Sequence, residues 1–331
     1  MKNYAAKVVA GLILFFSMFA AGASAQDNAA AIDAHLIAAR NAAGFDFTDL
    51  LARLCVAPEW VPNVVRDNPP APAPPRDTWY AEPAKVFDNL YFVGSKIHNS
   101  WALTGSEGII LIDTIFTYNS EEEIIGGLKK LGLDPAKVKY VIISHAHGDH
   151  DGGAKLMQDR YGSRIVMGGP DWDSIDKSVN GFPQGKPKRD IVADDGQKIT
   201  LGDIAVTLIA TPGHTPGTLS MIFTVKDNGK PLTVAYSGGT SFNFPSTPEN
   251  FDIYAKSQAK MGAAVASANA TVLLSNHSEY DSAITKIKLL ALRKPGESSP
   301  FEIGQEAVGR YFVVGRECAQ AEKIRLTQPQ K

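Results

Sequence analysis

The chain has 331 residues, of which 44% are hydrophobic and 21% charged. This is an ordinary balance for a globular protein that can bury a full core. Its formal net charge of −2 gives no basic excess of the kind that nucleic acid or an anionic membrane surface attracts. We therefore expect no nucleic-acid partner, while the composition leaves the oligomeric state open.

Residues 1–25 have the pattern of a secretory signal peptide. A start with Lys2 and Lys7 leads into the apolar run Val8–Ala20, and Ala23-Ser24-Ala25 then gives a small-x-small cleavage pattern. An uncleaved membrane anchor is the alternative, but the apolar run is shorter than the roughly 20 residues that span a bilayer. We predict cleavage after Ala25 and a periplasmic or secreted protein with no membrane segment in its mature form.

Residues 26–80 predict a helical and proline-rich N-terminal appendage. Asp27–Leu54 is rich in alanine and has a helical apolar rhythm, whereas the prolines within Asn68–Pro75 require an extended chain. That stretch is either a strap on the main domain or a free spacer. The only cysteines are Cys55 and Cys318. In an oxidising compartment an even count favours a disulfide to the C-terminal helix, with two separate buried thiols as the alternative.

Residues 81–331 form the predicted main domain, in which short strands and helices alternate. The predicted strands are Val86–Val93, Trp101–Thr104, Ile109–Thr114, Val138–Ser144, Arg164–Met167, Ile204–Ala210, Leu219–Val225, Leu232–Ser237 and Thr271–Leu274. The predicted helices are Ser120–Lys130, Gly153–Arg160, Phe251–Ala266, Ala283–Arg293 and Pro300–Glu322. Ser120 followed by Glu123 has the pattern of a capping box. So many strands favour two packed sheets with helices outside, which predicts an α/β fold of four layers, an αββα sandwich.

Three imidazoles and a carboxylate follow the buried strand Val138–Ser144 within six residues. In an extended chain, side chains two residues apart point the same way, so His145 and His147 can converge on one ion. The chain then turns through small residues that let the backbone bend tightly, which presents Asp149 and His150 to a neighbouring point. Zinc binds imidazole nitrogen and carboxylate oxygen, so the sequence predicts a metal centre here.

This cluster, His145-x-His147-x-Asp149-His150, resembles the H-x-H-x-D-H signature of the metallo-β-lactamase superfamily. Three further stretches resemble other motifs of that family in the same order: Leu111–Thr114, Thr211–Gly217 and Asn276-His277. The resemblance covers Val86 to His277 and implies the metallo-β-lactamase fold with two Zn²⁺ ions. It assigns the first ion to His145, His147 and His214, and the second to Asp149, His150 and His277. It also implies that Asp113 orients the ligand loop by accepting hydrogen bonds.

One departure from the family narrows the predicted function. Many superfamily hydrolases place a bridging aspartate, or in some lactamases a cysteine, where this chain has Tyr236–Thr240, which holds neither carboxylate nor thiol. The third subclass of metallo-β-lactamases also lacks that group, and Asp227–Leu232 resembles the same subclass. The resemblance thus implies a dinuclear zinc hydrolase that opens a cyclic amide of a small-molecule substrate by metal-activated hydroxide, with a β-lactam as the leading substrate. The predicted signal peptide adds that this enzyme is exported. A lactone, ester or thioester hydrolase is the alternative, and a non-catalytic zinc-binding protein the remote one.

The remaining candidate residues are assigned less directly. Asp149 is the expected catalytic group, because it would ligate the second zinc and also accept a hydrogen bond from the attacking hydroxide. His98 lies between two early strands and is a candidate substrate contact, with a solvated loop histidine as the alternative. His35 is expected at the surface. The basic loop 180–189 could form a cleft wall that attracts a carboxylate, although a solvated run of charges is the simpler interpretation.

Overall fold

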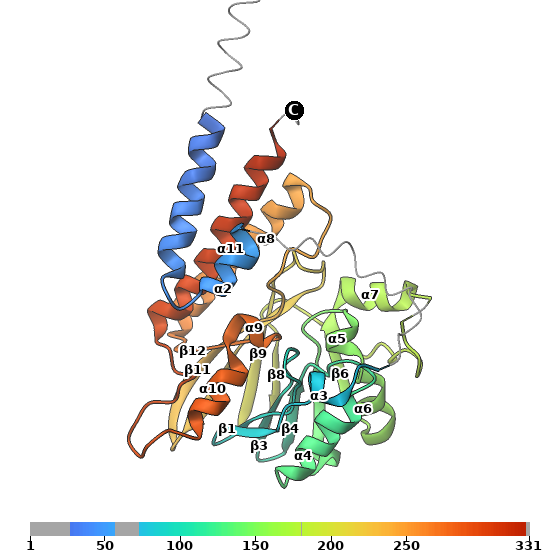
Figure 1. Cartoon of the computed structure of the whole chain (residues 1–331). Helices are drawn as coiled ribbons and strands as arrows, with labels where there is room; N and C mark the ends of the chain where they lie inside the picture. The colour runs from blue at the N-terminus through green and yellow to red at the C-terminus, as the bar shows by residue number, and fades with distance from the viewer. Residues whose placement is uncertain (1–26, 57–72, 180, 329–331) are drawn as a thin grey trace, which may run out of the picture.

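Two β-sheets packed face to face form the centre of the molecule, which a computed structural model describes over residues 27–56, 73–179 and 181–328 (Figure 1). The seven-stranded sheet has the order β1-β2-β3-β4-β5-β6-β7, and the five-stranded sheet has the order β12-β11-β10-β9-β8. The first sheet consists of β1 (Ala84–Phe87), β2 (Leu90–Phe92), β3 (Trp101–Gly105), β4 (Gly108–Ile112), β5 (Val138–Ile142), β6 (Arg164–Gly168) and β7 (Ile191–Ala193). The second consists of β8 (Lys198–Leu201), β9 (Ile204–Ala210), β10 (Leu219–Asp227), β11 (Lys230–Ser237) and β12 (Val272–Ser275).

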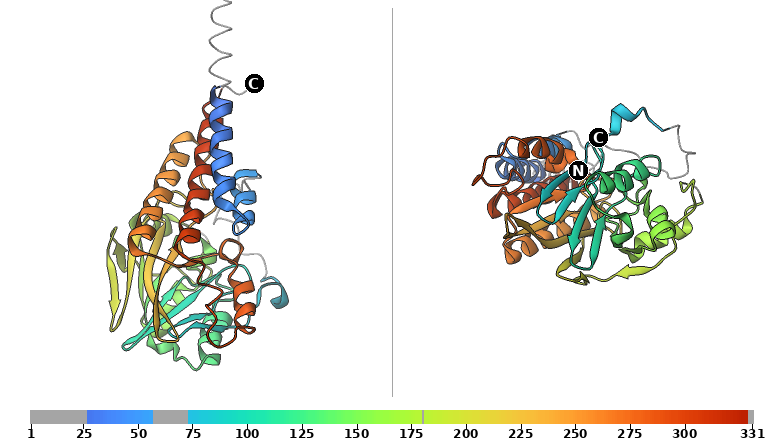
Figure 2. Two further views of the ribbon diagram at one scale, coloured as in Figure 1. Left: turned by 90° about the vertical axis from the view of Figure 1, so that its left-hand side faces the viewer. Right: turned by 90° about the horizontal axis from the view of Figure 1, so that it is seen from below.

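Helices cover the outer face of each sheet (Figures 1 and 2). The first sheet carries η2 (Glu121–Gly126), α4 (Gly127–Lys130), α6 (Ala154–Tyr161) and α7 (Gly169–Lys177), and the second carries α8 (Pro248–Ala268) and α11 (Gln305–Leu326). The shorter helices are α2 (Thr48–Leu51), η1 (Ala52–Val56), α3 (Arg76–Trp79), η3 (Pro135–Lys137), α5 (Gly148–Asp151), α9 (Ser278–Asp281) and α10 (Ala283–Leu290).

Three buried apolar layers hold these elements together. Residues of both sheets, such as Trp101 and Leu208, fill the central layer. Leu111 and Trp172 belong to the layer beneath α4, α6 and α7, and Phe312 belongs to the layer beneath α8 and α11. Successive residues of β4 alternate between the central layer and an outer one, so the whole strand is apolar. This layering confirms the predicted four-layer αββα sandwich.

Several local elements differ from the sequence prediction. The predicted strand Val86–Val93 is a hairpin of β1 and β2, and α7, β7 and β8 were not predicted. The predicted capping box is wrong: Ser120 already has helical backbone angles and makes no capping hydrogen bond. The Glu123 carboxylate accepts a hydrogen bond from the Ala81 backbone N–H at 3.0 Å instead, which fixes the start of the main domain to this helix.

Glu123 should make stability fall as the pH rises. Glu123 is 1% exposed, and burial raises the pKa of its carboxyl group from 4.5 to about 8. Between pH 4.5 and about 8 the folded chain retains a proton that the unfolded chain has released. The contribution of Glu123 to stability is therefore fully present below pH 4.5 and is lost as the pH rises to about 8. We expect wild type to lose about 1 kcal/mol or more between pH 6 and pH 8 relative to Glu123→Gln. Urea unfolding at both pH values measures this, with exposed Glu122→Gln as control, and equal slopes in Glu123→Gln and wild type would contradict it.

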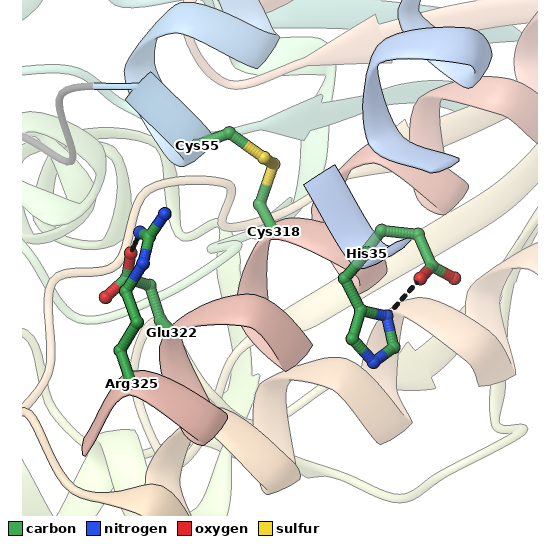
Figure 3. Close-up of a disulfide and its surroundings, with 6 residues drawn as sticks. His35, Cys55, Cys318, Glu322 and Arg325 are labelled. Carbon is green, nitrogen blue, oxygen red and sulfur yellow. Dashed lines mark hydrogen bonds and ion pairs between the residues drawn. A yellow bond between two sulfur atoms is a disulfide. The ribbon is translucent and has the colours of Figure 1, made fainter. Parts of the chain in front are cut away.

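The N-terminal segment packs on the second sheet's helices. A helix over residues 27–43 runs beside α11 in both side views (Figures 1 and 2). Ala39, Leu50 and Leu54 belong to the same buried cluster as α8 and α11. His35, expected at the surface, is partly buried with its Nδ1 atom 2.6 Å from Glu317 Oε2 (Figure 3). The predicted signal peptide and most of the proline-rich stretch lie outside the described residues. Within the described part, the helices are too short or too polar to span a membrane.

A disulfide joins Cys55 of η1 to Cys318 of α11 across a sequence separation of 263 residues (Figure 3). A cross-link stabilises mainly by restricting the unfolded chain, and more so for a long loop. We expect the double variant Cys55→Ser with Cys318→Ser to lose about 2–4 kcal/mol in urea unfolding. Reductant should destabilise wild type by a similar amount and leave the double variant unchanged. If complete reduction of the disulfide left the free energy of unfolding of wild type unchanged, the disulfide would not contribute to stability.

Candidate metal centre

The six residues assigned to the metals lie on three loops that follow strands at one end of the sandwich. The loop after β5 carries His145 and His147 and continues into α5, which contains Asp149 and His150. The β9–β10 loop carries His214, and His277 follows β12 directly. Strands β4, β5 and β6 are parallel, so the loop after β5 emerges where the chain also leaves β4 and β6.

The first group is a triangle of imidazole nitrogens. His214 Nε2 lies 3.1 Å from His145 Nε2 and 3.2 Å from His147 Nδ1. Zinc–nitrogen bonds of about 2.0–2.1 Å in tetrahedral geometry separate two ligand nitrogens by about 3.4 Å. The three nitrogens therefore have the spacing of ligands that share one ion, and the structure brings together the residues that the family resemblance assigned to the first zinc.

The outer ring nitrogens of this triangle are held by backbone carbonyls. His145 Nδ1 donates to Gly238 O at 2.8 Å, and His214 Nδ1 donates to Ser241 O at 2.7 Å. With those protons placed, each Nε2 presents a lone pair to the centre. Burial lowers the pKa of His145 well below its usual value and that of His214 to about 4, so both rings are neutral at neutral pH. Neutral, oriented imidazoles are the donors that a zinc ion requires, so this group fits zinc.

The second group centres on the Asp149 carboxylate. Its Oδ2 atom lies 3.2 Å from His150 Nε2 and 3.3 Å from His277 Nε2, and these two nitrogens are 3.1 Å apart. Burial by itself would raise the pKa of Asp149, but the imidazoles of His150 and His277 lower it well below its usual value. Burial would lower the pKa of His150, but Asp149 and Asp113 outweigh it and raise that pKa to about 10. The site therefore favours positive charge between its carboxylate and its imidazoles, and this donor set also fits a zinc ion.

Asp113 supports the ligand loop from below. Its Oδ1 accepts the Ser144 backbone N–H at 2.6 Å, and its Oδ2 accepts the Ser144 and Tyr236 hydroxyls at 2.8 Å each. The same Oδ2 is 3.2 Å from His150 Nδ1. Asp113 is fully buried and has φ of 60°, which turns the chain sharply after β4. The carboxylate thus fixes both the first residue of the ligand loop and the ring of one predicted ligand.

Asp171 is a second buried carboxylate that the sequence analysis missed. Its Oδ2 accepts the Ala146 N–H and the Thr215 hydroxyl at 2.7 Å each, and its Oδ1 accepts the Gly217 N–H at 2.8 Å. Asp171 thereby joins the loop between His145 and His147 to the turn after His214. The sequence does contain a pattern that could have indicated this helix: Pro170-Asp171 follows a predicted strand, and a proline followed by an acidic residue is typical of a helix start.

His98 also faces the second group. Its Nε2 lies 3.5 Å from Asp149 Oδ2, its side chain is 16% exposed, and its ring packs edge-on against Phe116 and His277. Burial lowers its pKa to about 3, so the ring is neutral at neutral pH. The alternative of a solvated loop histidine is therefore wrong.

The strand end that lacks a bridging carboxylate has no room for one. A Cβ atom on Gly239 would lie 2.6 Å from His214 Cβ, and one on Gly238 would lie 1.7 Å from Leu219 O. The nearby Thr240 hydroxyl pairs with the Tyr311 hydroxyl at 2.8 Å. The loop therefore passes directly beneath His214, and the predicted ligands remain imidazoles and the Asp149 carboxylate.

A cleft of about 720 Å³ opens beside His147 and His214. Its wall is largely apolar and includes Val179, Phe244 and Ile253, and Lys177 of α7 supplies a positive charge. Two cations of the basic loop have partners on α7, in line with the simpler interpretation of that loop: Lys186 Nζ donates to Asp176 O at 2.9 Å, and Arg189 pairs with Asp173 and Asp176. Lys177, which precedes that loop, is thus the cation placed to attract a substrate carboxylate at the cleft wall.

Comparisons with known proteins point to one family. A model of the metallo-beta-lactamase superfamily matches residues 93–229. The chain is 30% identical to an N-acyl homoserine lactonase from a Bacillus species over 128 residues, which are 38% of this chain and 48% of that protein. It is 30% identical to a hydroxyacylglutathione hydrolase from Pseudomonas putida over 115 residues, 33% of this chain and 38% of that protein. The matches thus span less than half of the length of these curated relatives.

Solved structures extend the likeness to most of the chain. BJP-1, a subclass B3 metallo-β-lactamase of Bradyrhizobium japonicum, matches with a TM-score of 0.60 and 28% identity, over 70% of this chain and 90% of that one. A metallo-β-lactamase from Cronobacter sakazakii matches with a TM-score of 0.64 and 25% identity, over 80% of this chain and 98% of that one. Residues 93–229, which include the loops of His145 and His214, thus match the metallo-beta-lactamase superfamily in sequence, and the sandwich as a whole has the metallo-β-lactamase fold, with subclass B3 enzymes among its structural neighbours.

Proposed function

We propose that the chain is an exported metal-dependent hydrolase that holds two zinc ions and opens cyclic amides, with β-lactams as the leading substrate class. The observation that carries this proposal is the ligand set: five histidines and Asp149 converge in two adjoining groups, with no bridging carboxylate from the strand end at Gly238-Gly239. The similarity to subclass B3 β-lactamases supports the choice of substrate.

The residues around the centre each have a chemical role in such a reaction. A zinc pair supplies Lewis-acid polarisation of a carbonyl and a lowered pKa of water. The ionised Asp149 Oδ2 can accept a proton or hydrogen bond from the attacking water and hold it in line. His145 and His214, fixed by backbone carbonyls, keep the centre preorganised. Lys177 at the cleft can bind a substrate carboxylate, and the apolar wall can hold the adjoining group.

A second candidate is the hydrolysis of a lactone or thioester. It is favoured by the apolar cleft wall of Val179, Phe244 and Ile253, which would accept an acyl chain. The sequence matches to an N-acyl homoserine lactonase and a hydroxyacylglutathione hydrolase are consistent with it.

Hydrolysis of a chromogenic cephalosporin by the zinc-loaded chain starting at Gln26 tests the two candidates. Turnover that a chelator abolishes and zinc restores would support β-lactam hydrolysis. No turnover while zinc remains bound would contradict that substrate class and favour the lactone or thioester candidate, to be assayed with an acyl homoserine lactone and an acyl thioester. No turnover of any of these substrates would favour a non-catalytic zinc-binding protein.

Export is part of the same proposal. The predicted signal peptide and the disulfide between Cys55 and Cys318 are both consistent with an oxidising compartment. Cell fractionation and N-terminal sequencing test it. A mature chain that starts at Gln26 in the periplasm or medium is expected, and a cytoplasmic chain that retains residues 1–25 would contradict it.

A further inference from the structure

The loop that carries His98 is bound to the segment that carries His277. The Ser95 N–H donates to His98 O at 2.8 Å, which closes the loop on itself. The Asn99 N–H donates to Asn276 O and the Ser278 N–H donates to Ile97 O, both at 2.8 Å, so the two segments form an antiparallel bridge at His98 and His277. These backbone bonds hold the two histidines side by side.

The ring of His98 is directed at the second metal group. Its Nε2 lies 3.5 Å from Asp149 Oδ2, and one ligand atom each from His98, Asp149 and His277 lie within 4.8 Å of one another. The opposite nitrogen, Nδ1, is 3.5 Å from Ser95 Oγ. The edge of the ring packs on Phe116 with centroids 4.9 Å apart. The ring is therefore confined between protein groups, with one nitrogen facing the carboxylate.

The spacing distinguishes a shared metal from a direct ion pair. A nitrogen–oxygen hydrogen bond has a length of about 2.7–3.2 Å. The 3.5 Å between His98 and Asp149 exceeds that range. It is close to the separation of about 3.4 Å between two ligands of one tetrahedral zinc ion. His277 Nε2, a ligand by family resemblance, lies at the similar distance of 3.3 Å from the same oxygen.

We propose that His98 is an additional ligand of the second metal, beside Asp149, His150 and His277. This inference rests on the proposed function, and it goes beyond the ligand set that the family resemblance assigns. His98 would approach this ion from the side of Asp149 and His277, with which it shares one group of ligand atoms, while its ring centroid lies 6.4 Å from that of His150. The second metal would then have four protein ligands and the first only three, so the second would be the more tightly held.

Metal affinity provides the test, independent of turnover. The variants are His98→Ala and His98→Phe, which keeps a ring against Phe116 but offers no nitrogen, with His35→Ala as a control far from the centre. Zinc is titrated against a chromophoric chelator, and visible spectra of the cobalt-substituted proteins report the coordination number. We expect both His98 variants to bind the second zinc at least about tenfold more weakly than wild type and to change the cobalt spectrum. The first zinc and the His35→Ala control should be unaffected.

Two different results would contradict the ligand role of His98 and the proposed zinc-hydrolase function, so the two can be told apart. Two zinc ions bound as tightly in both His98 variants as in wild type would overturn the ligand role, and an altered KM alone would make His98 a substrate contact. A wild-type chain that binds no zinc would contradict the proposed function itself. Circular dichroism of the metal-free variants separates lost affinity from lost folding, and a folded His98→Phe suffices for the comparison if His98→Ala does not fold.

Discussion

Replacing Asp149 with asparagine is expected to lower kcat/KM by about 10²–10⁴-fold while the chain keeps its fold. The Asp149 Oδ2 atom lies 3.2 Å from His150 Nε2 and 3.3 Å from His277 Nε2, at the centre of the second metal group. Asparagine has the same shape but no negative charge, so it is a poor metal ligand and a poor proton acceptor. The surrounding imidazoles would then lack the anionic group that favours a cation among them.

The measurement combines steady-state kinetics with zinc analysis after dialysis. Asp149→Asn should keep the first zinc ion, whose group of three histidines is unchanged, and bind the second more weakly than wild type, because the second group loses its carboxylate. Asp159→Asn is the matched control, since this carboxylate is 53% exposed on α6 and pairs only locally with Lys155. It should retain wild-type activity and both ions. Turnover by Asp149→Asn equal to that of Asp159→Asn would exclude Asp149 from the chemistry.

Local sequence patterns predicted the part of the centre that depends on neighbouring residues. A continuous apolar run marks β5 because both faces of that strand are buried, and the histidines two residues apart follow from the period of an extended chain. His214 and His277 come from distant parts of the sequence, and only the family resemblance linked them to this loop. The structure places both beside it, with nitrogens 3.1 Å from those of His145 and His150.

The features that sequence patterns missed depend on contacts between distant segments. The approach of His98 to Asp149 results from a backbone bridge to His277, and backbone hydrogen bonding leaves no mark in residue types. The cleft uses Lys177, while the more obvious cation Arg189 pairs with Asp173 and Asp176. Charge density along the sequence was therefore a poor guide to charge in the cleft, because Arg189 is paired with carboxylates of α7.

Asp171 is the missed residue whose replacement should have the largest structural effect. Its carboxylate is 1% exposed and accepts the Ala146 N–H, the Gly217 N–H and the Thr215 hydroxyl. Asp171→Ala would leave these buried donors without this acceptor, and each unsatisfied donor costs about 1–3 kcal/mol. We expect a loss of about 3–6 kcal/mol in urea unfolding of the metal-free chain. Asp173→Ala on the same helix is the matched control, because its exposed carboxylate pairs with Arg189 at the surface and should change stability by less than about 0.5 kcal/mol.

The same carboxylate should also control metal affinity, because it spans two ligand loops. Ala146 lies between His145 and His147, and the turn from Thr215 to Gly217 follows His214, so loss of Asp171 removes a hydrogen-bonded support from both loops that carry the first group. Asp171→Asn keeps the size of the side chain but sets an amide N–H₂ against buried donors, and serves if Asp171→Ala does not fold. We expect either variant to bind the first zinc about 10–100-fold more weakly than wild type in chelator competition. The second zinc, whose ligands Asp171 does not contact in these hydrogen bonds, should be affected less. First-site affinity and stability that match those of Asp173→Ala would show that the ligand loops hold their geometry without this carboxylate.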